Sequence, residues 1–554
     1  MSGIPLIDEK CTGAFVASAI GDALGWPNEF RASNINKKTK PVSNFVEWTR
    51  SSGGRYWSHN EKILAGEYSD DTQMNLAVAR SILSGKPWAG HLADVELPFW
   101  LEYERGGGGA LKRAAKLWKK KTEPWKGTSS DIDLYFNAGG NGAAMRVLPH
   151  VISGVKKEFV VIANDIARDA SLTHGHPRAI VGAMCYSYAL WYLFKKTDTL
   201  SFGELANAVI SAQNEWNKIP DILNGEWLET AKSSQDYTHV WIATVDNVVS
   251  QLKLITAALE KGALDSENET LETLGCFNKN VNGAGDIAAI AAIYYASKYA
   301  NNPVLGIKSA ANAIGADTDT IASMVGGLLG ALMGLSWIPT EWKTVQDYEC
   351  LIQITELLLS ENRKEASKAF VSKVKKQIGG WESTPIGLMR SLDIFTVKSG
   401  KSVRVIITKR QSSLGQTMYF KEYKRNETDP HQLEVQTQRQ FTLQDLAAQH
   451  QSNIDNLSPR QTEKNVLNNK NIDFHDYRRQ FTLDAERITA LLGDPQFKKN
   501  ITIGKVLQVI QVLITDNKAI ESIAKRYEIE PTMVALINKY VDSCFLNDAS
   551  KMTK

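Results

Sequence analysis

A long uncharged segment in the second half of the chain constrains the fold more than any other feature. Residues Ile321–Ile338 carry no charged side chain, and Gly326, Gly330 and Gly334 recur in it at four-residue spacing. Residues four apart lie on one face of an α-helix, so these glycines form a smooth stripe that another backbone can approach closely. The segment therefore predicts a central helix that packs tightly against a second helix.

The same segment is about long enough to cross a membrane, which is the alternative interpretation. Asp317 and Asp319 stand immediately before it, and Pro339 stands immediately after it. We favour a buried core helix and expect no membrane association.

Helical periodicity continues through most of the first part of the chain. Strand-like alternation is scarce there, and the glycine-rich stretches 104–110 and 137–143 are expected to be loops between helices. We therefore predict an all-α helical bundle. The apolar-periodic runs that predict its helices lie at 10–24, 72–84, 160–170, 179–195, 243–262, 284–299, 304–314 and 319–334.

The composition of the chain changes near residues 381–400. All 14 tryptophans lie at or before Trp381, and of the 39 glycines only four lie beyond residue 390. The stretch between about 381 and 400 resembles linker sequence. We predict a main domain at 1–385 and a smaller C-terminal accessory domain at 395–554.

The accessory domain is predicted to be α+β or mostly helical. The β-rich runs 402–410 and 417–425 predict a hairpin, and helical runs follow near 441–457, 483–492, 503–514 and 518–544. The segment 519–540 has the outline of a helix-turn-helix, but helical hairpins that bind no nucleic acid share that outline. We favour packing or binding of a partner protein, with nucleic-acid binding as the alternative.

The charge balance and the cysteines give no sign of a nucleic-acid-binding or secreted protein. Lys and Arg number 64 against 61 Asp and Glu, a net charge of +3, which is too small for a global field that attracts nucleic acid or membrane. The five cysteines are scattered, no CxxC motif occurs, and the N-terminus lacks a basic segment followed by an apolar one. A reducing, cytoplasmic location is expected.

Two acidic clusters stand directly before helical runs. The first is Tyr68–Gln73, with sequence YSDDTQ, and the second is Gly315–Thr320, with sequence GADTDT. Each alone is explained by helix capping, because Ser and Asp are favoured N-caps and Asp70 with Gln73 resembles a capping box. If the two helix starts converged, however, their carboxylates would repel one another. A hard divalent cation such as Mg²⁺, Mn²⁺ or Ca²⁺ would remove that repulsion, and spacing alone does not show whether the clusters meet.

Further motifs complete a recognisable order. Gly21–Gly25, with sequence GDALG, precedes Glu29, and the motifs GNGAAMR (140–146) and THGHP (173–177) lie between the two acidic clusters. With these motifs, the chain resembles the ADP-ribosylglycohydrolase family over about residues 10–345. The resemblance implies an all-α fold with two Mg²⁺ ions in a central cleft, for which Mn²⁺ can substitute.

The resemblance also implies roles for individual residues. Asp319 would bridge the two ions, and Glu29, on the loop after the first helix, would act in catalysis together with Asp70 and Asp71. The metal ligands would be Ser69, Asp70, Asp71 and Asp319 for one ion, and Asp317, Asp319 and Thr320 for the other.

The substrate-binding residues implied by the motifs are Gly140, Asn141, Gly142, Arg146 and His174. Backbone amides of the glycine loop can approach a diphosphate, since glycine has no side chain to block them. Arg146 either clamps phosphate or pairs with a buried carboxylate, and both interpretations stay open. His174 would contact the distal ribose or phosphate. His176 is expected to cap a helix, with a His174–His176 metal site as the less favoured alternative.

These features predict a Mg²⁺-dependent hydrolase that removes ADP-ribose from an acceptor, most readily a protein side chain such as arginine. Two rival functions remain. One is an ADP-ribose-binding protein without turnover, and the other is a hydrolase of ADP-ribosylated nucleic acid targeted by the C-terminal domain. Asp22 in the first helix is expected to hold that helix by hydrogen bonds rather than to touch substrate.

Overall fold

The computed structural model describes residues 4–29, 41–54, 57–363, 380–399 and 403–425, and isolated positions beyond 500. Two compact units divide the chain, Met1–Thr428 and Asp429–Lys554. Of the second unit only the positions Val509, Val534, Ala535, Ile537, Asn538 and Val541 are described, and they are helical. The helix-turn-helix outline and the helices predicted beyond 440 therefore lie almost wholly outside the described residues.

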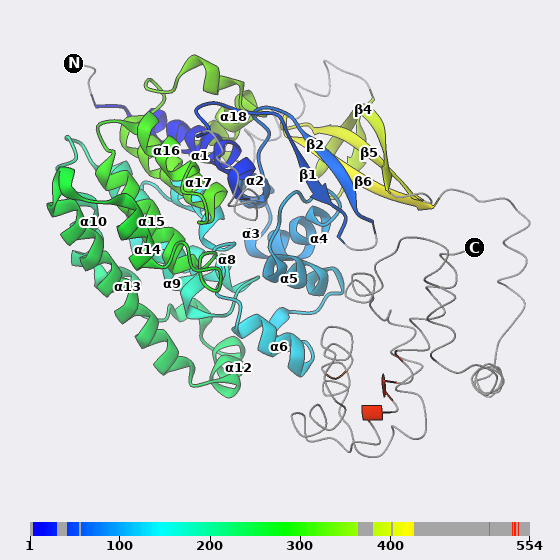
Figure 1. Cartoon of the computed structure of the whole chain (residues 1–554), viewed down its shortest axis with the longest axis horizontal. Coiled ribbons are helices and arrows are strands. Elements are labelled where there is room, and N and C mark those ends of the chain that lie inside the picture. The colour runs from blue at the N-terminus through cyan, green and yellow to red at the C-terminus, as the bar shows by residue number, and fades with distance from the viewer. Residues whose placement is uncertain are drawn as a thin grey trace, which may run out of the picture. The chain divides into compact units, whose positions relative to one another are not determined.

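Two helices run through the centre of the first unit, α1 (Ile7–Glu29) and α17 (Thr318–Met333). A Cβ added to Gly326 would lie less than 3.0 Å from the backbone carbonyl of Ala17, and one added to Gly21 would meet the carbonyl of Ala322 in the same way. The glycine stripe of α17 thus faces a second glycine stripe on α1. The predicted close approach of two backbones is confirmed, and Figure 1 shows the two helices side by side.

Other helices cover this central pair. Six of them lie at predicted positions: α2 (Asp70–Leu83), α8 (Phe159–Ser171), α9 (Pro177–Lys195), α13 (Tyr237–Glu260), α15 (Gly285–Lys298) and α16 (Pro303–Ala311). The other α-helices of the unit are α3 (Trp88–His91), α4 (Leu97–Trp100), α5 (Gly109–Lys119), α6 (Ser129–Phe136), α7 (Leu148–Ser153), α10 (Glu204–Ser211), α11 (Gln213–Trp216), α12 (Glu226–Ser234), α14 (Glu267–Leu274) and α18 (Tyr348–Leu359). The helical-bundle prediction is confirmed.

One helix among the described residues, α13, is long and apolar enough to cross a membrane by length and composition alone. Its buried residues Trp241, Val245, Val248 and Leu252 recur at the spacing of one helix face. That face packs on the neighbouring helices, which is typical of a core-facing helix in a globular bundle. The predicted candidate, α17, is shorter, and almost all of its residues are buried inside the unit.

Two antiparallel sheets complete the unit. Strands β1 (Trp48–Ser52) and β2 (His59–Ile63) form a hairpin, and β3 (Glu382–Thr384), β4 (Gly387–Ser399), β5 (Val403–Ser412) and β6 (Thr417–Arg425) follow one another in a four-stranded sheet. The predicted hairpin at 402–425 is confirmed as β5 and β6. Strand β4 occupies the stretch that was predicted to be linker. A register shift between Ser391 and Asp393 interrupts its alternation, which explains why its sequence did not indicate a strand.

The compact helical unit extends beyond the predicted boundary at 385–395. Strand β6 packs directly on the helices: the Thr417 N–H donates to Asp347 Oδ2 at 2.7 Å, and the Phe420 ring lies 5.7 Å from those of Phe99 and Tyr103. The composition change near 381–400 therefore marks the start of this sheet, and the boundary between the two units lies near Thr428. Figure 1 shows β4–β6 in yellow beside the blue hairpin β1–β2.

Replacing Gly326 by alanine tests the close helix contact. The new Cβ would overlap the backbone of α1, which cannot move aside as a side chain would. We expect Gly326→Ala to lower the free energy of unfolding by about 3 kcal/mol, measured by urea denaturation. Gly90→Ala is the control, because Gly90 lies in helix α3 with nothing within 4 Å of an added Cβ. Equal stability of the two variants would contradict the contact.

Candidate active site

The first acidic cluster forms the start of helix α2. Ser69 is the N-cap, and its hydroxyl accepts a hydrogen bond from the Asp71 N–H at 3.2 Å. The predicted capping box of Asp70 with Gln73 does not form, because the Gln73 side chain accepts from Trp100 Nε1 at 3.1 Å and from the Arg105 N–H at 3.3 Å. Neither Asp70 nor Asp71 is the capping residue, so both carboxylates are free for another role.

The second acidic cluster forms the start of helix α17. Asp317 occupies the N-cap position, yet its side chain makes no capping hydrogen bond. Instead, its Oδ2 accepts from Asn141 Nδ2 at 2.9 Å. Capping explains the backbone position of Asp317 but not the direction of its carboxylate, which points toward the glycine loop.

The two helix starts meet in space. Thr320 Oγ1 donates to Asp71 Oδ2 at 3.3 Å, and Ser69 Oγ lies 3.5 Å from the same oxygen. The other oxygen, Asp71 Oδ1, is buried and has no hydrogen-bond partner. Segments about 250 residues apart in the chain thus form one acidic site.

Helix α1 holds both helix starts in place. Asp22 accepts hydrogen bonds from the backbone N–H groups of Ser69 and Thr72, both at 2.9 Å, and from Thr72 Oγ1 at 2.6 Å. On the other side, a Cβ added to Gly25 would collide with the backbone of Thr318 and Asp319. The GDALG motif therefore holds the start of α2 through Asp22, and its glycines leave room for the backbone of α17. Asp22 is fully buried and structural, as expected.

Burial and mutual repulsion raise the pKa values of the clustered carboxyls. Burial, with the charges of Glu104 and Asp22, raises the pKa of Asp70 to about 8. Burial, followed by the charges of Asp22 and Asp70, holds the pKa of Asp71 well above its usual range. Burial, followed by Glu29 and Asp317, does the same for Asp319. Each carboxyl is thus costly to ionise beside the others, and a cation between them would reverse that effect.

Glu29 lies at the edge of this cluster. It is the last residue of α1, whereas it was predicted to stand on the loop after that helix. Burial, with the charges of Asp317 and Asp70, raises its pKa to about 8, which places its carboxyl beside both acidic clusters. Its side chain is less buried than those of Asp71 and Asp319.

The residues present fit hard divalent cations. The donors are carboxylate and hydroxyl oxygens, and Asp71 Oδ1 is an orphaned buried acceptor. Within the described parts of the chain, no three His, Cys, Asp or Glu side chains are already arranged as a formed metal site.

A glycine loop lies against the acidic site. The Asn141 N–H donates to the carbonyl of Gly283 at 2.9 Å, and a Cβ on Gly142 would lie 3.0 Å from the His174 ring. The His174 ring therefore packs closely against the loop backbone, and Asn141 joins the loop to Asp317. A group bound at the acidic site has this loop as its neighbour.

Arg146 supports the loop from beneath. Its guanidinium is fully buried and donates to Asp169 Oδ1 at 2.6 Å, to the carbonyl of Gly142 at 3.0 Å and to Thr173 Oγ1 at 2.8 Å. Of its two predicted roles, pairing with a buried carboxylate agrees with the structure. Its donors are engaged within the protein, so Arg146 positions the loop rather than clamping a phosphate.

The His174 ring lies against the same loop. Burial, followed by the charge of Arg146, lowers the pKa of His174 to about 3, so the ring is neutral. Its Nδ1 lies 2.8 Å from Thr173 Oγ1, which also accepts from Arg146. Its Nε2 lies next to Gly140 and Gly142. A ribose hydroxyl can donate to or accept from such a nitrogen, according to the tautomer of the ring.

His176 stands at the start of helix α9. Its ring Nδ1 accepts from the Arg178 N–H at 3.1 Å and caps helix α9, as expected.

One element of the site was not expected from the sequence. Gly106 adopts φ +117°, and a Cβ there would lie 2.6 Å from Asp70 Oδ1. The stretch 104–110 was predicted only to be a loop. In the sequence, this loop is distinguished by an arginine directly before its run of glycines. That residue, Arg105, is almost fully buried in the structure.

Comparisons with known proteins identify the family of the chain. The ADP-ribosylglycohydrolase family model matches residues 5–368. The chain is 25% identical over 222 residues to the ADP-ribosyl-dinitrogen reductase glycohydrolase of Rhodospirillum rubrum, covering 39% of this chain and 68% of that protein. It is 26% identical over 360 residues to the ADP-ribosylhydrolase ARH3 of Homo sapiens, covering 61% and 89%. It is 24% identical over 349 residues to the ADP-ribosylarginine hydrolase Tri1 of Pseudomonas putida, covering 60% and 73%. The family model matches well over half of this chain, so the chain belongs to the ADP-ribosylglycohydrolase family.

Proposed function

We propose that this protein is a Mg²⁺-dependent hydrolase that releases ADP-ribose from an ADP-ribosylated protein side chain, with arginine as the favoured acceptor. The observation that carries the proposal is the meeting of two acidic helix starts at Asp71 and Thr320. The names of similar proteins support the reaction class, since one of these proteins is an ADP-ribosylarginine hydrolase. The free, buried cysteines of the described residues, Cys11, Cys185, Cys276 and Cys350, fit a cytoplasmic location.

Two Mg²⁺ ions would be held by the predicted ligands at the starts of α2 and α17, with Asp319 shared between them. When bound, such ions fix the ribose hydroxyls and lower the pKa of a bound water. The opposing carboxylates, which repel one another without a cation, supply the negative charge for this site. Asp22 keeps Ser69, Asp70 and Asp71 oriented through the backbone of α2.

The chain's other residues orient the rest of the substrate. The backbone of Gly140 and Gly142 and the ring of His174 would lie against the diphosphate or the distal ribose. Asn141 links that position to the acidic site through Asp317. With the substrate fixed at both ends, the glycosidic carbon would lie at the edge of the cluster, beside Glu29.

Glu29 is placed to transfer the proton of the reaction. Hydrolysis breaks the bond between the C1″ carbon of ribose and the acceptor, adds a water hydroxyl to C1″ and returns one proton to the acceptor. The Glu29 carboxylate would accept the proton from water and pass it to the departing acceptor atom. Its position at the end of α1, less buried than Asp70, Asp71 and Asp319, suits a group that faces the acceptor.

A panel of substrates tests the activity and its metal requirement. The full-length protein is incubated with Arg-, Ser- and nucleobase-linked ADP-ribose, and released ADP-ribose is measured. We expect release from the arginine-linked substrate, loss of activity in EDTA and recovery with Mg²⁺ or Mn²⁺. Full activity in metal-free protein would contradict the metal dependence. Binding of ADP-ribose without release from any substrate would favour the non-catalytic rival, and release from the nucleobase-linked substrate alone would favour the nucleic-acid rival.

Replacing Asp319 tests its assignment as the bridging ligand. Asp319→Ala removes a ligand from both proposed ions, so Mg²⁺ affinity and turnover should fall together, each by at least about 100-fold. Thr320→Ala removes one neutral oxygen and should have a smaller effect. Calorimetric titration with Mg²⁺ beside single-turnover rates measures both quantities. Near wild-type Mg²⁺ affinity in Asp319→Ala would refute the bridging role.

Replacing Glu29 separates proton transfer from metal binding. Glu29→Gln keeps the size of the side chain but removes its capacity to take a proton, so kcat should fall by about 10²–10⁴-fold. Affinities for ADP-ribose and Mg²⁺ should stay nearly unchanged. Glu47→Gln, at an exposed ion pair with Lys62, is the matched control. Wild-type turnover in Glu29→Gln would remove Glu29 from the mechanism.

A further inference from the structure

The wall beside Asp70 is formed by backbone. Gly106 lies so close that an added Cβ would be 2.6 Å from Asp70 Oδ1 and 3.6 Å from Ser69 Cβ. The Gly106 backbone therefore limits the directions in which the Asp70 carboxylate can point. Any displacement of this loop would change the position of a proposed Mg²⁺ ligand.

Arg105 fixes that loop. Its side chain is 1% exposed and donates from Nε to Glu61 Oε1 and from Nη2 to Glu67 Oε2, both at 2.9 Å. Its backbone N–H also donates to Gln73 on α2. Arg105 thus ties the loop to helix α2 through its backbone and, through its side chain, to two carboxylates carried by strand β2 and the turn after it.

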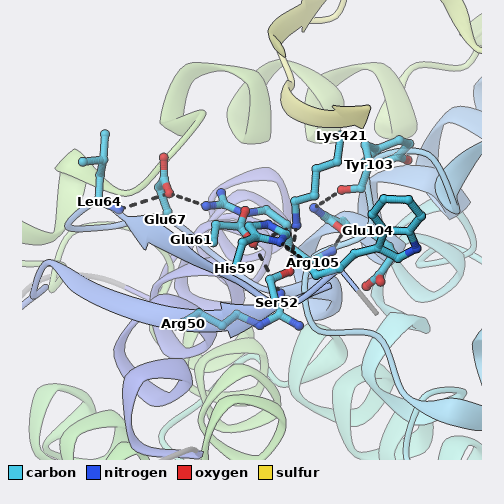
Figure 2. Close-up of polar contacts among 12 residues, drawn as sticks. Arg50, Ser52, His59, Glu61, Leu64, Glu67, Tyr103, Glu104, Arg105 and Lys421 are labelled. Carbon is cyan, nitrogen blue, oxygen red and sulfur yellow. Dashed lines mark hydrogen bonds and ion pairs between the residues drawn. The ribbon is translucent and has the colours of Figure 1, made fainter. Parts of the chain in front are cut away.

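Strand β6 completes this network. Lys421 Nζ donates to Glu61 Oε2 at 2.7 Å and to Ser52 Oγ at 3.3 Å, and Tyr419 donates its hydroxyl to Glu67 Oε1. The Tyr419 ring also lies 4.1 Å from the Arg105 guanidinium carbon. In Figure 2, Lys421 reaches down to Glu61 while Arg105 lies beside it. Each carboxylate is therefore shared between Arg105 and a residue of β6.

Cations surround the two carboxylates of the network. Burial alone would raise the pKa of Glu61, but Arg105 and Lys421, followed by Arg50, lower it to about 2, so Glu61 is ionised. Arg50 Nη1 lies 3.9 Å from Glu61 Oε2, farther than the Lys421 and Arg105 donors. Removing one partner from such a buried set leaves a charge uncompensated, and the remaining groups must shift or admit water.

We propose that Lys421 and Tyr419 of strand β6 are positioning residues for the active site, acting on Asp70 through Glu61, Glu67 and Arg105. This inference rests on the proposed function, in which Asp70 binds Mg²⁺. Both residues lie beyond residue 368, where the family match ends. The C-terminal sheet of this chain is therefore part of its catalytic body, and the site is incomplete without it.

Substitutions in the full-length protein test this role. Lys421→Met removes the cation, and Tyr419→Phe removes only a hydroxyl. We expect each to weaken Mg²⁺ binding by about 10-fold in calorimetric titration of the folded protein. At saturating Mg²⁺ kcat should largely recover, because the ligands themselves are intact. Lys424→Met is the matched control, since Lys424 lies on the same strand in an exposed pair with Glu422, and it should bind Mg²⁺ as the wild type does.

The outcomes separate this inference from the proposed function. Folded Lys421→Met and Tyr419→Phe proteins with wild-type Mg²⁺ affinity would overturn the positioning role while leaving the metal site in place. If Lys421→Met does not fold, the Mg²⁺ affinity of Tyr419→Phe decides whether the positioning role holds. A lower melting temperature with unchanged Mg²⁺ affinity would show a purely structural role and would also overturn the inference. Failure of the wild-type protein to bind Mg²⁺ would overturn the proposed function itself, and the inference with it.

Discussion

The contact between helices α1 and α17 is the constraint on which the rest of the structure depends. Glycines on both helices remove the side chains that would otherwise hold the two backbones apart. Because α17 begins with Asp317 and Asp319, this contact brings one acidic cluster against α1. Asp22 on α1 then holds the other cluster by hydrogen bonds to the start of α2. A packing requirement in the core therefore determines where the carboxylates of the site lie.

The acidic site and the Arg105 network show two opposite treatments of buried charge. In the network, Glu61 and Glu67 are each matched by a cation or a hydroxyl, and Glu61 stays ionised. In the site, Asp71 and Asp319 are buried among other carboxyls, and their pKa values rise. The first arrangement fixes its side chains in position, and the second leaves carboxyl groups whose negative charge no cationic side chain neutralises. A cation-binding site needs both features, rigid surroundings and carboxylates that the protein itself does not neutralise.

The sequence allowed the helices and the acidic clusters to be predicted, because both signals are local. Apolar periodicity located α1, α2, α8, α9, α13, α15, α16 and α17 to within a few residues. The hairpin β1–β2 gave only a weak signal, since two of the three buried residues of β2, His59 and Glu61, are polar and only Ile63 is apolar. The meeting of Asp71 with Thr320, the engagement of Arg146 and the packing of β6 on the helices are contacts between distant segments. Local patterns cannot specify such contacts, so composition placed the domain boundary too early.

The positions of Glu61 and Arg105 explain why a sheet beyond the family match belongs to this site. An arginine buried beside two glutamates is stable only when every carboxylate oxygen has a partner. Outside strand β6, Arg105 supplies one donor to each glutamate, the Leu64 N–H donates to Glu67 Oε2, and Arg50 Nη1 lies 3.9 Å from Glu61 Oε2. Lys421 adds a closer cation at Glu61 Oε2, and Tyr419 supplies the donor to Glu67 Oε1. A chain that places Arg105 in its interior to fix the loop beside Asp70 therefore also requires a polar element over Glu61 and Glu67, and strand β6 is that element.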